Sequence, residues 1–324
     1  MRSWTVRAVV AVAFLTLPSC ERGKVPPAEG EPEATANDGT VEGQSLLGRR
    51  LERPSLPEAF RRQQEELLSA ARADLEARPD DPEALIWVAR RTAYLGRYQE
   101  AIDLYAEGIA LHPEEAKLYR HRGHRYITTR QLDAAVADLE RAVVLIEGRP
   151  DEAEPAGLPN ERGVPTSTSH SNIWYHLGLA YYLQGEFNSA LRAFRECLRV
   201  SATPDMVVAA SHWLYMTLRR TGREAEAEAV LEPIDAGLDV IENRDYHRLI
   251  LMYKGQLTPR ELRRRARSSG GLSVATVGYG VGNWYLYNGR ADRAVEVFRG
   301  IVEGSQWAAF GFIAAEAELA RMGD

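Results

Sequence analysis

The chain has 324 residues, of which 45% are hydrophobic and 27% charged, a composition typical of a globular protein or a solenoid. Its formal net charge of −6 argues against a general nucleic-acid binder, because such proteins are more often basic overall. Two cysteines exclude a disulfide-stapled scaffold and a zinc site built from three or four cysteine ligands.

Residues 1–20 have the pattern of a secretory signal peptide. Arg2 and Arg7 supply positive charge, and an apolar run that is too short to cross a bilayer comfortably follows them. The run ends at 17-LPSC-20, which resembles a bacterial lipobox, although Pro18 departs from the usual residue. The resemblance implies lipidation of Cys20, and a plain signal peptide is the alternative. The other cysteine, Cys197, has an apolar setting that predicts a buried thiol.

Residues 21–55 are rich in proline, glycine and glutamate and contain few large apolar side chains. Such a segment cannot bury enough surface to offset its chain entropy. We therefore predict a flexible acidic linker, able to hold a folded body roughly 30–35 Å from a lipid anchor.

An internal period of 34 residues runs through the rest of the chain. Ala89 and Gly123 lie one period apart, as do Ala101 and Ala135. Within each repeat, apolar residues recur at three- and four-residue spacing, which predicts two amphipathic helices. The predicted units lie at about 82–115, 116–149, 171–204, 208–241 and 275–308, after an incomplete unit at 57–79.

The third unit contains Trp174, Leu177, Gly178, Tyr181, Ala190 and Phe194 at the spacing of the tetratricopeptide repeat, W-x2-L-G-x2-Y…A-x3-F. The chain therefore resembles tetratricopeptide proteins from about residue 57 to its end. The resemblance implies an all-α solenoid of helix-turn-helix units, wound as a right-handed superhelix.

Two segments interrupt the period, and one follows the last unit. Residues 148–170 are rich in proline, glycine and serine or threonine, which predicts a loop, either beside a binding face or disordered and without a role. Residues 245–270 form a degenerate unit, with a capping box at Thr258 and Glu261 and an arginine run at 263–267 that predicts a solvated helix face. Residues 307–322 predict an amphipathic helix that closes the last unit.

This C-terminal order, together with the lipobox and the acidic linker, resembles the tetratricopeptide lipoproteins of the NlpI type. The resemblance implies an adaptor of the Gram-negative envelope that brings peptidoglycan hydrolases and periplasmic proteases together, and it suggests a homodimer. Glu21 after the lipidated cysteine favours the outer membrane, facing the periplasm. A pilotin-like factor that assembles a pilus or secretion system is an alternative.

The stretch 119-YRHRGHRYITTR-130 contains residue types that can form a metal or phosphate site. His121 and His124 could face one ion, but a site needs three or four ligands, and no HExxH motif is present. The stretch 278-GYGVGN-283 is not a G-x-G-x-x-G loop and no strand precedes it. We predict no metal, no cofactor and no enzymatic activity, with a hydrolase using the His/Arg face as the alternative from another class. His121 is expected to face solvent.

The remaining predicted activity is protein binding. In tetratricopeptide proteins the first helix of each unit lines a concave groove, and carrying that register over gives a basic and aromatic surface. Its arginines offer forked donors for acidic peptide segments, so charge reversal at Arg120 is expected to weaken binding without unfolding. For individual side chains, packing between helices or pairing with glutamate is the alternative. The predicted groove residues are Arg90, Tyr94, Arg120, His124, Tyr175, Tyr182, His212, Arg219, Arg220, Tyr279 and Tyr287.

Overall fold

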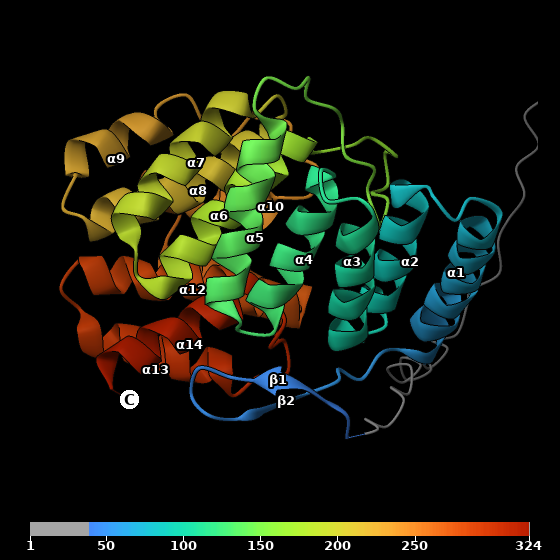
Figure 1. The fold of residues 1–324 in the computed structure, drawn as a ribbon. Helices are drawn as coiled ribbons and strands as arrows, with labels where there is room; N and C mark the ends of the chain where they lie inside the picture. Colours follow the sequence, from blue (N-terminus) through green and yellow to red (C-terminus); the bar gives the residue numbers. More distant parts are fainter. Residues whose placement is uncertain (1–38, 324) are drawn as a thin grey trace, which may run out of the picture. The chain divides into compact units, whose positions relative to one another are not determined.

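The computed structural model describes residues 39–323, which form fourteen helices and one two-stranded sheet (Figure 1). The predicted signal peptide, the lipidation site Cys20 and the first part of the predicted linker lie outside the described residues. No helix among residues 39–323 combines the length and apolarity needed to cross a bilayer.

The helices follow one another as antiparallel pairs, which confirms the all-α solenoid of helix-turn-helix units. After the hairpin of β1 (Val41–Gln44) and β2 (Arg50–Glu52) and a single helix α1 (Glu58–Ala77), the pairs are α2 (Pro82–Tyr94) with α3 (Tyr98–Leu111), α4 (Ala116–Thr128) with α5 (Leu132–Ile146), α6 (Ser169–Gln184) with α7 (Phe187–Val200), α8 (Pro204–Arg220) with α9 (Glu224–Leu231), α10 (Arg244–Tyr253) with α11 (Pro259–Ser269), and α12 (Gly271–Tyr287) with α13 (Ala291–Val302), followed by α14 (Phe310–Met322).

Small residues on the first helix of several units allow the close pairing. A Cβ atom added at Gly178 would lie 2.7 Å from the Phe194 ring, and one at Gly282 would lie 2.5 Å from Phe298. These are the positions that the repeat pattern predicts to be small. The aromatic residue of the second helix therefore packs directly against the backbone of the first.

The turn between the two helices of a unit requires a left-handed residue. Gly96 takes it in the first unit with φ of 75°, whereas Arg130 occupies the same position one period later with φ of 65°. A non-glycine residue in this conformation costs roughly 1–2 kcal/mol. Something else must hold Arg130 in place, and the contacts of its side chain, described below, do so.

The predicted flexible linker ends earlier than residue 55. Residues 41–52 form the antiparallel hairpin β1–β2 instead, with Leu51 buried. The Arg49 guanidinium donates to the Val302 carbonyl (2.9 Å), and the Trp307 indole donates to the Glu52 carbonyl (2.9 Å). The prediction was wrong for these residues because long-range hydrogen bonds to the C-terminal part of the solenoid, invisible in local composition, order the segment.

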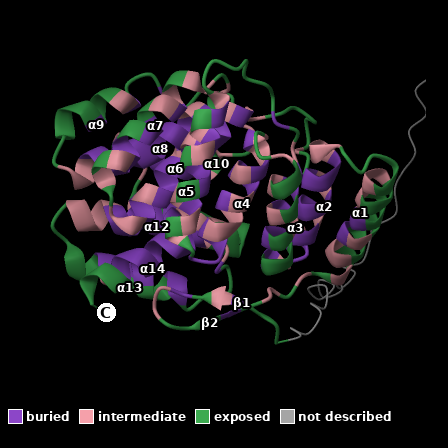
Figure 2. Ribbon diagram, viewed as in Figure 1, coloured by how far each residue is buried: buried purple, intermediate pink, exposed green. Residues whose placement is uncertain are grey.

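The C-terminal helix α14 does contact the last pair, α12 and α13, as predicted, but it also packs against α6. Residues 311–319 are buried without interruption, and Figure 2 colours the helix accordingly. The prediction of an amphipathic helix was wrong on this point, since both faces of α14 are covered. The helix lies between the last unit and the earlier units, on the concave side.

Candidate protein-binding groove

The eleven predicted groove residues all lie on the first helices of their units, namely α2, α4, α6, α8 and α12. None of them is exposed. Arg90, Arg120, Tyr175, Tyr182, His212 and Tyr279 are buried, and Tyr94, His124, Arg219, Arg220 and Tyr287 are half-buried. Part of this burial is packing between helices, as for His212, which stacks on Tyr246 of α10 at 4.5 Å. The rest of the cover over the concave face comes from two segments of the same chain.

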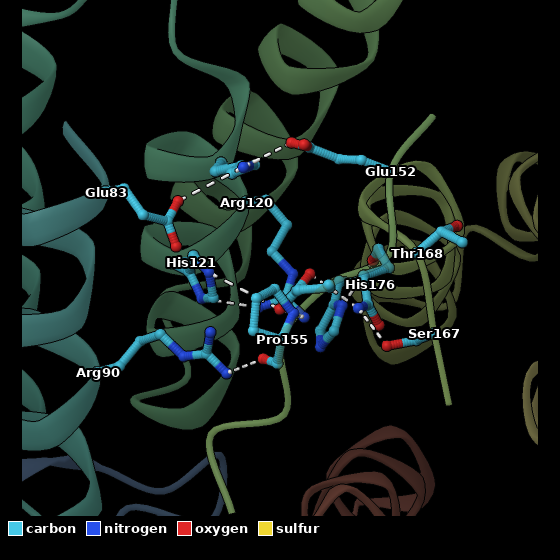
Figure 3. A network of polar contacts seen from close by, with 12 residues as sticks. Glu83, Arg90, Arg120, His121, Glu152, Pro155, Ser167, Thr168 and His176 are labelled. Carbon is cyan, nitrogen blue, oxygen red and sulfur yellow. Dashed lines mark hydrogen bonds and ion pairs between the residues drawn. The ribbon is translucent and has the colours of Figure 1, made fainter. Parts of the chain in front are cut away.

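The first cover is the insert at residues 148–170, which we call the strap. Arg90 Nη2 donates to the Pro155 carbonyl (3.0 Å), and Arg91 Nη1 donates to the Gly157 carbonyl (2.9 Å). Arg120 forms an ion pair with Glu154 at 3.1 Å (Figure 3). Glu154 is itself buried, so this pair lies inside the protein rather than on an open surface.

The far end of the strap is attached to the loop before α10. Arg162 forms an ion pair with Asp239 at 2.7 Å. Asn160 and Thr166 both donate to the carboxylate of Glu242, at 2.7 and 2.9 Å. The strap is thus an ordered crossing from α2 and α4 to the loop before α10, and not the disordered loop that was one of the two expectations.

The strap also bears on the burial and protonation of His121. Its side chain is only 6% exposed, so the expectation that it faces solvent was wrong. Its Nδ1 lies 2.7 Å from Arg120 Nη1, and because arginine can only donate, the imidazole nitrogen accepts. Burial, reinforced by the charges of Arg120 and Arg90, lowers the pKa of His121 well below its usual value. The ring is therefore neutral near pH 7.

A second histidine, which the sequence did not single out, completes this part of the groove. The rings of His124 and His176 are 4.5 Å apart, and Phe310 of α14 packs against both, at 5.2 and 5.7 Å. Burial is the main cause that lowers the pKa of both histidines well below the usual value. Among the described residues, no group of three or more His, Cys, Asp and Glu side chains could hold a metal ion.

The second cover is α14, which brings two buried carboxylates into the groove. Glu316 pairs with Arg130 at 2.9 Å, and Glu318 pairs with Arg220 at 2.6 Å. Glu316 is 2% exposed and Glu318 1%. The Tyr279 hydroxyl donates to Tyr182 (2.7 Å) and lies 3.3 Å from Glu318. The acidic segment that the basic groove was expected to accept is thus, in part, a helix of the same chain.

The remaining predicted cation of α8 is also engaged. Arg219 forms an ion pair with Glu224 at 3.3 Å and lies 4.6 Å above the ring of Tyr287. Arg120, Arg219 and Arg220 are thus each paired with a carboxylate of the same chain, whereas Arg90 bonds a backbone carbonyl. Whether any of the eleven residues contacts a partner stays a prediction.

Surface openings are present among the described residues. One, of about 450 Å³, lies between the strap, α10 and α14, where Tyr175, Tyr246 and Phe310 face Glu242 and Asp245. Another, of about 730 Å³, is formed by α5, α6 and α7, with Trp174, Leu177 and Tyr181 in its lining but none of the eleven predicted groove residues. Both lie within the size range of ligand pockets.

Comparison with known proteins supports the repeat assignment. Residues 171–202 match the family model of the tetratricopeptide repeat, and these residues are α6 and α7. The structure titled "Crystal structure of MamA" is 18% identical with a TM-score of 0.39, over 59% of this chain and 90% of that chain. A tetratricopeptide protein described as having an unusual peptide-binding site, YrrB, is 16% identical with a TM-score of 0.42, over 73% and 92%.

A third solved structure is a putative kinesin light chain of Podospora anserina with nearly identical repeats. One form is 18% identical over 69% of this chain and 94% of that chain, and another is 17% identical over 69% and 95%, both with a TM-score of 0.42. These neighbours do not indicate what the present chain binds. The matched residues form one helix pair, α6 and α7, and the pairs around it have the same helix-turn-helix arrangement.

Proposed function

We propose that this protein is a lipid-anchored adaptor of a bacterial envelope that binds other proteins without catalysis. The observation that carries the proposal is the solenoid of tetratricopeptide-type helix pairs, whose extended surfaces are suited to holding protein segments. The sequence 17-LPSC-20 supports the anchor, and the resemblance to the NlpI type supports partners among cell-wall hydrolases or periplasmic proteases.

The alternative of a hydrolase that uses the His/Arg face is disfavoured by access. Arg120 and His121 lie beneath the strap, and Glu154 already occupies the guanidinium. A general base must reach a substrate proton directly or through one water. A buried neutral imidazole covered by its own chain cannot do so in this conformation.

A pull-down of the full chain from detergent-solubilised envelopes of its source bacterium tests the proposal. Recovery of wall hydrolases or proteases supports it, whereas recovery of secretin or pilus subunits supports the pilotin-like role. Absence of any specific partner contradicts both. Cys20→Ala should release the protein from membranes into the soluble fraction, and persistent membrane association would refute the anchor.

A further inference from the structure

Helix α11 carries an unusual concentration of positive charge. Its eleven residues include five arginines, at 260, 263, 264, 265 and 267, and one acidic residue, Glu261. Leu262 and Ala266 are buried against α10 and α12 and fix the helix to the solenoid. Arg263 is half-buried, and the other four arginines are exposed.

These arginines differ from most arginines near the groove in lacking carboxylate partners. Arg120, Arg130 and Arg220 are each paired with a glutamate of the same chain. Among residues 39–323, no carboxylate forms an ion pair with any of the five arginines of α11. The single acid of the helix, Glu261, accepts hydrogen bonds from the Thr258 hydroxyl and backbone and serves as its cap. The positive charge of α11 is therefore available to an outside partner.

A small cavity lies directly beside this charge. It measures about 190 Å³ and is formed between α11, α12 and α13. Its lining is mixed: apolar side chains of Ala266, Val274, Val297 and Ile301 lie beside Arg263 and Arg267. The cavity is smaller than a typical pocket for drug-sized ligands, but it has room for one large apolar side chain.

We propose that α11 and this cavity form a docking site for an acidic peptide segment in which one large apolar side chain is flanked by carboxylates. The inference rests on the proposed adaptor function and names the surface and the partner chemistry. Guanidinium groups recognise carboxylates through paired hydrogen bonds, and the cavity fixes the register of the segment. Because the chain as a whole is negative, an acidic partner is repelled elsewhere and directed to this patch.

The chain offers a variant that closes the cavity without removing charge. A Cβ atom added at Gly300, in the lining, would meet no atom within 4 Å. Gly300→Leu should therefore fold normally, since leucine also favours a helix more than glycine does. Its added side chain would occupy the space that the apolar residue of a peptide requires.

Fluorescence anisotropy with the full chain and a labelled peptide, Asp-Glu-Asp-Leu-Glu-Asp-Glu, tests the site. The double variant R263Q/R267Q should weaken binding by about tenfold. G300L should weaken it by about tenfold as well, but should leave unchanged the weaker binding of a peptide with alanine in place of leucine. R149Q/R192Q, which removes two exposed arginines from other parts of the solenoid, is the matched control and should bind like the wild type.

Equal losses in R263Q/R267Q and in the control would reduce the effect to net charge and overturn the proposal, as would unaltered binding by G300L. Binding to phosphatidylglycerol vesicles that depends on Arg263 and Arg267, without peptide binding, would identify a membrane surface and also overturn it. The envelope pull-down distinguishes failure of the α11 site from failure of the adaptor function. If wild type and R263Q/R267Q recover the same partner equally, the α11 site is wrong and the adaptor function stands; if the wild type recovers none, the adaptor function fails.

Discussion

The ion pair between Arg130 and Glu316 joins α14 to the second unit, and its removal should be costly. Both side chains are almost completely buried, 2% and 3% exposed, at 2.9 Å. The Arg130 guanidinium also donates to the Trp307 carbonyl at 2.7 Å. Glu316→Leu would leave that charge buried without its carboxylate, and breaking one side of such a pair typically costs about 3–5 kcal/mol.

The double variant should recover most of this loss. Arg130 stands where the preceding unit has Gly96, so Arg130→Gly also relieves a backbone cost of roughly 1–2 kcal/mol. In R130G/E316L neither charge remains, and the free energy of unfolding should return to within about 2 kcal/mol of the wild type, far from the sum of the single losses.

Chemical denaturation of the wild type and the three variants measures this cycle. Far-ultraviolet circular dichroism and tryptophan fluorescence should be followed together, because coincident curves are needed to treat the unfolding as two-state. A loss below about 1 kcal/mol for Glu316→Leu alone would refute the reasoning, since a buried guanidinium would then tolerate isolation. Additive single losses would show that the two side chains do not act as a pair.

Three further outcomes are expected. Burial lowers the pKa of His212 to about 3. The unfolded chain therefore binds a proton at this residue first, near pH 6.5, and the free energy of unfolding falls as the pH drops below that value. Denaturation curves should show that the stability of His212→Phe relative to the wild type rises by about 2 kcal/mol between pH 8 and pH 5. Gly123→Leu should lower the melting temperature by several degrees, because even a Cβ atom there would lie 2.8 Å from Leu139. Arg120→Glu would place a second carboxylate beside buried Glu154 and should cost at least about 3 kcal/mol in chemical denaturation, in contrast to the expectation from sequence that the fold would be unaffected.

The helix pairs could be predicted from sequence because their determinants are local. Gly178 and Phe194 belong to one unit and meet across a single turn, so a fixed spacing records their contact. The same holds for the capping box of Thr258 and Glu261, which lie three residues apart and bond as predicted. A period in the sequence captures contacts of this range.

The covers of the groove could not be predicted because they join residues far apart in the chain. Glu154 lies 34 residues after Arg120, and Glu316 lies 186 residues after Arg130. The first separation equals the repeat period, but Glu154 lies in the insert that interrupts the repeats, so the period does not place it opposite Arg120. One local signal was nevertheless present: Glu316 and Glu318 interrupt the run 313-IAAEAELA-320, which has no polar face to carry them. Acidic residues in a helix that is apolar all round require buried partners.

A second signal was the arginine in a glycine position. The turn of the second unit needs a left-handed residue, and the sequence places Arg130 there at a conformational cost. Such a cost persists only where surrounding contacts over-determine the residue. The anomaly therefore implied that the Arg130 side chain has strong partners, although it could not name Glu316 or Trp307.

The distribution of charge bears on where a partner can bind. A basic concave face in the sequence predicts acidic groups opposite it, but it does not say whether another protein or the same chain supplies them. Here the strap and α14 supply them, and displacing either would expose buried arginines such as Arg120 and Arg130 without their counter-ions.

An acidic partner that entered the groove would have to replace these internal pairs with pairs of equal geometry, so the net gain in binding free energy would be small. The same partner at α11 would neutralise charges that have no internal carboxylate, so the free energy of association would not be offset by a broken pair. Selectivity for acidic segments should therefore reside in α11 rather than in the concave face.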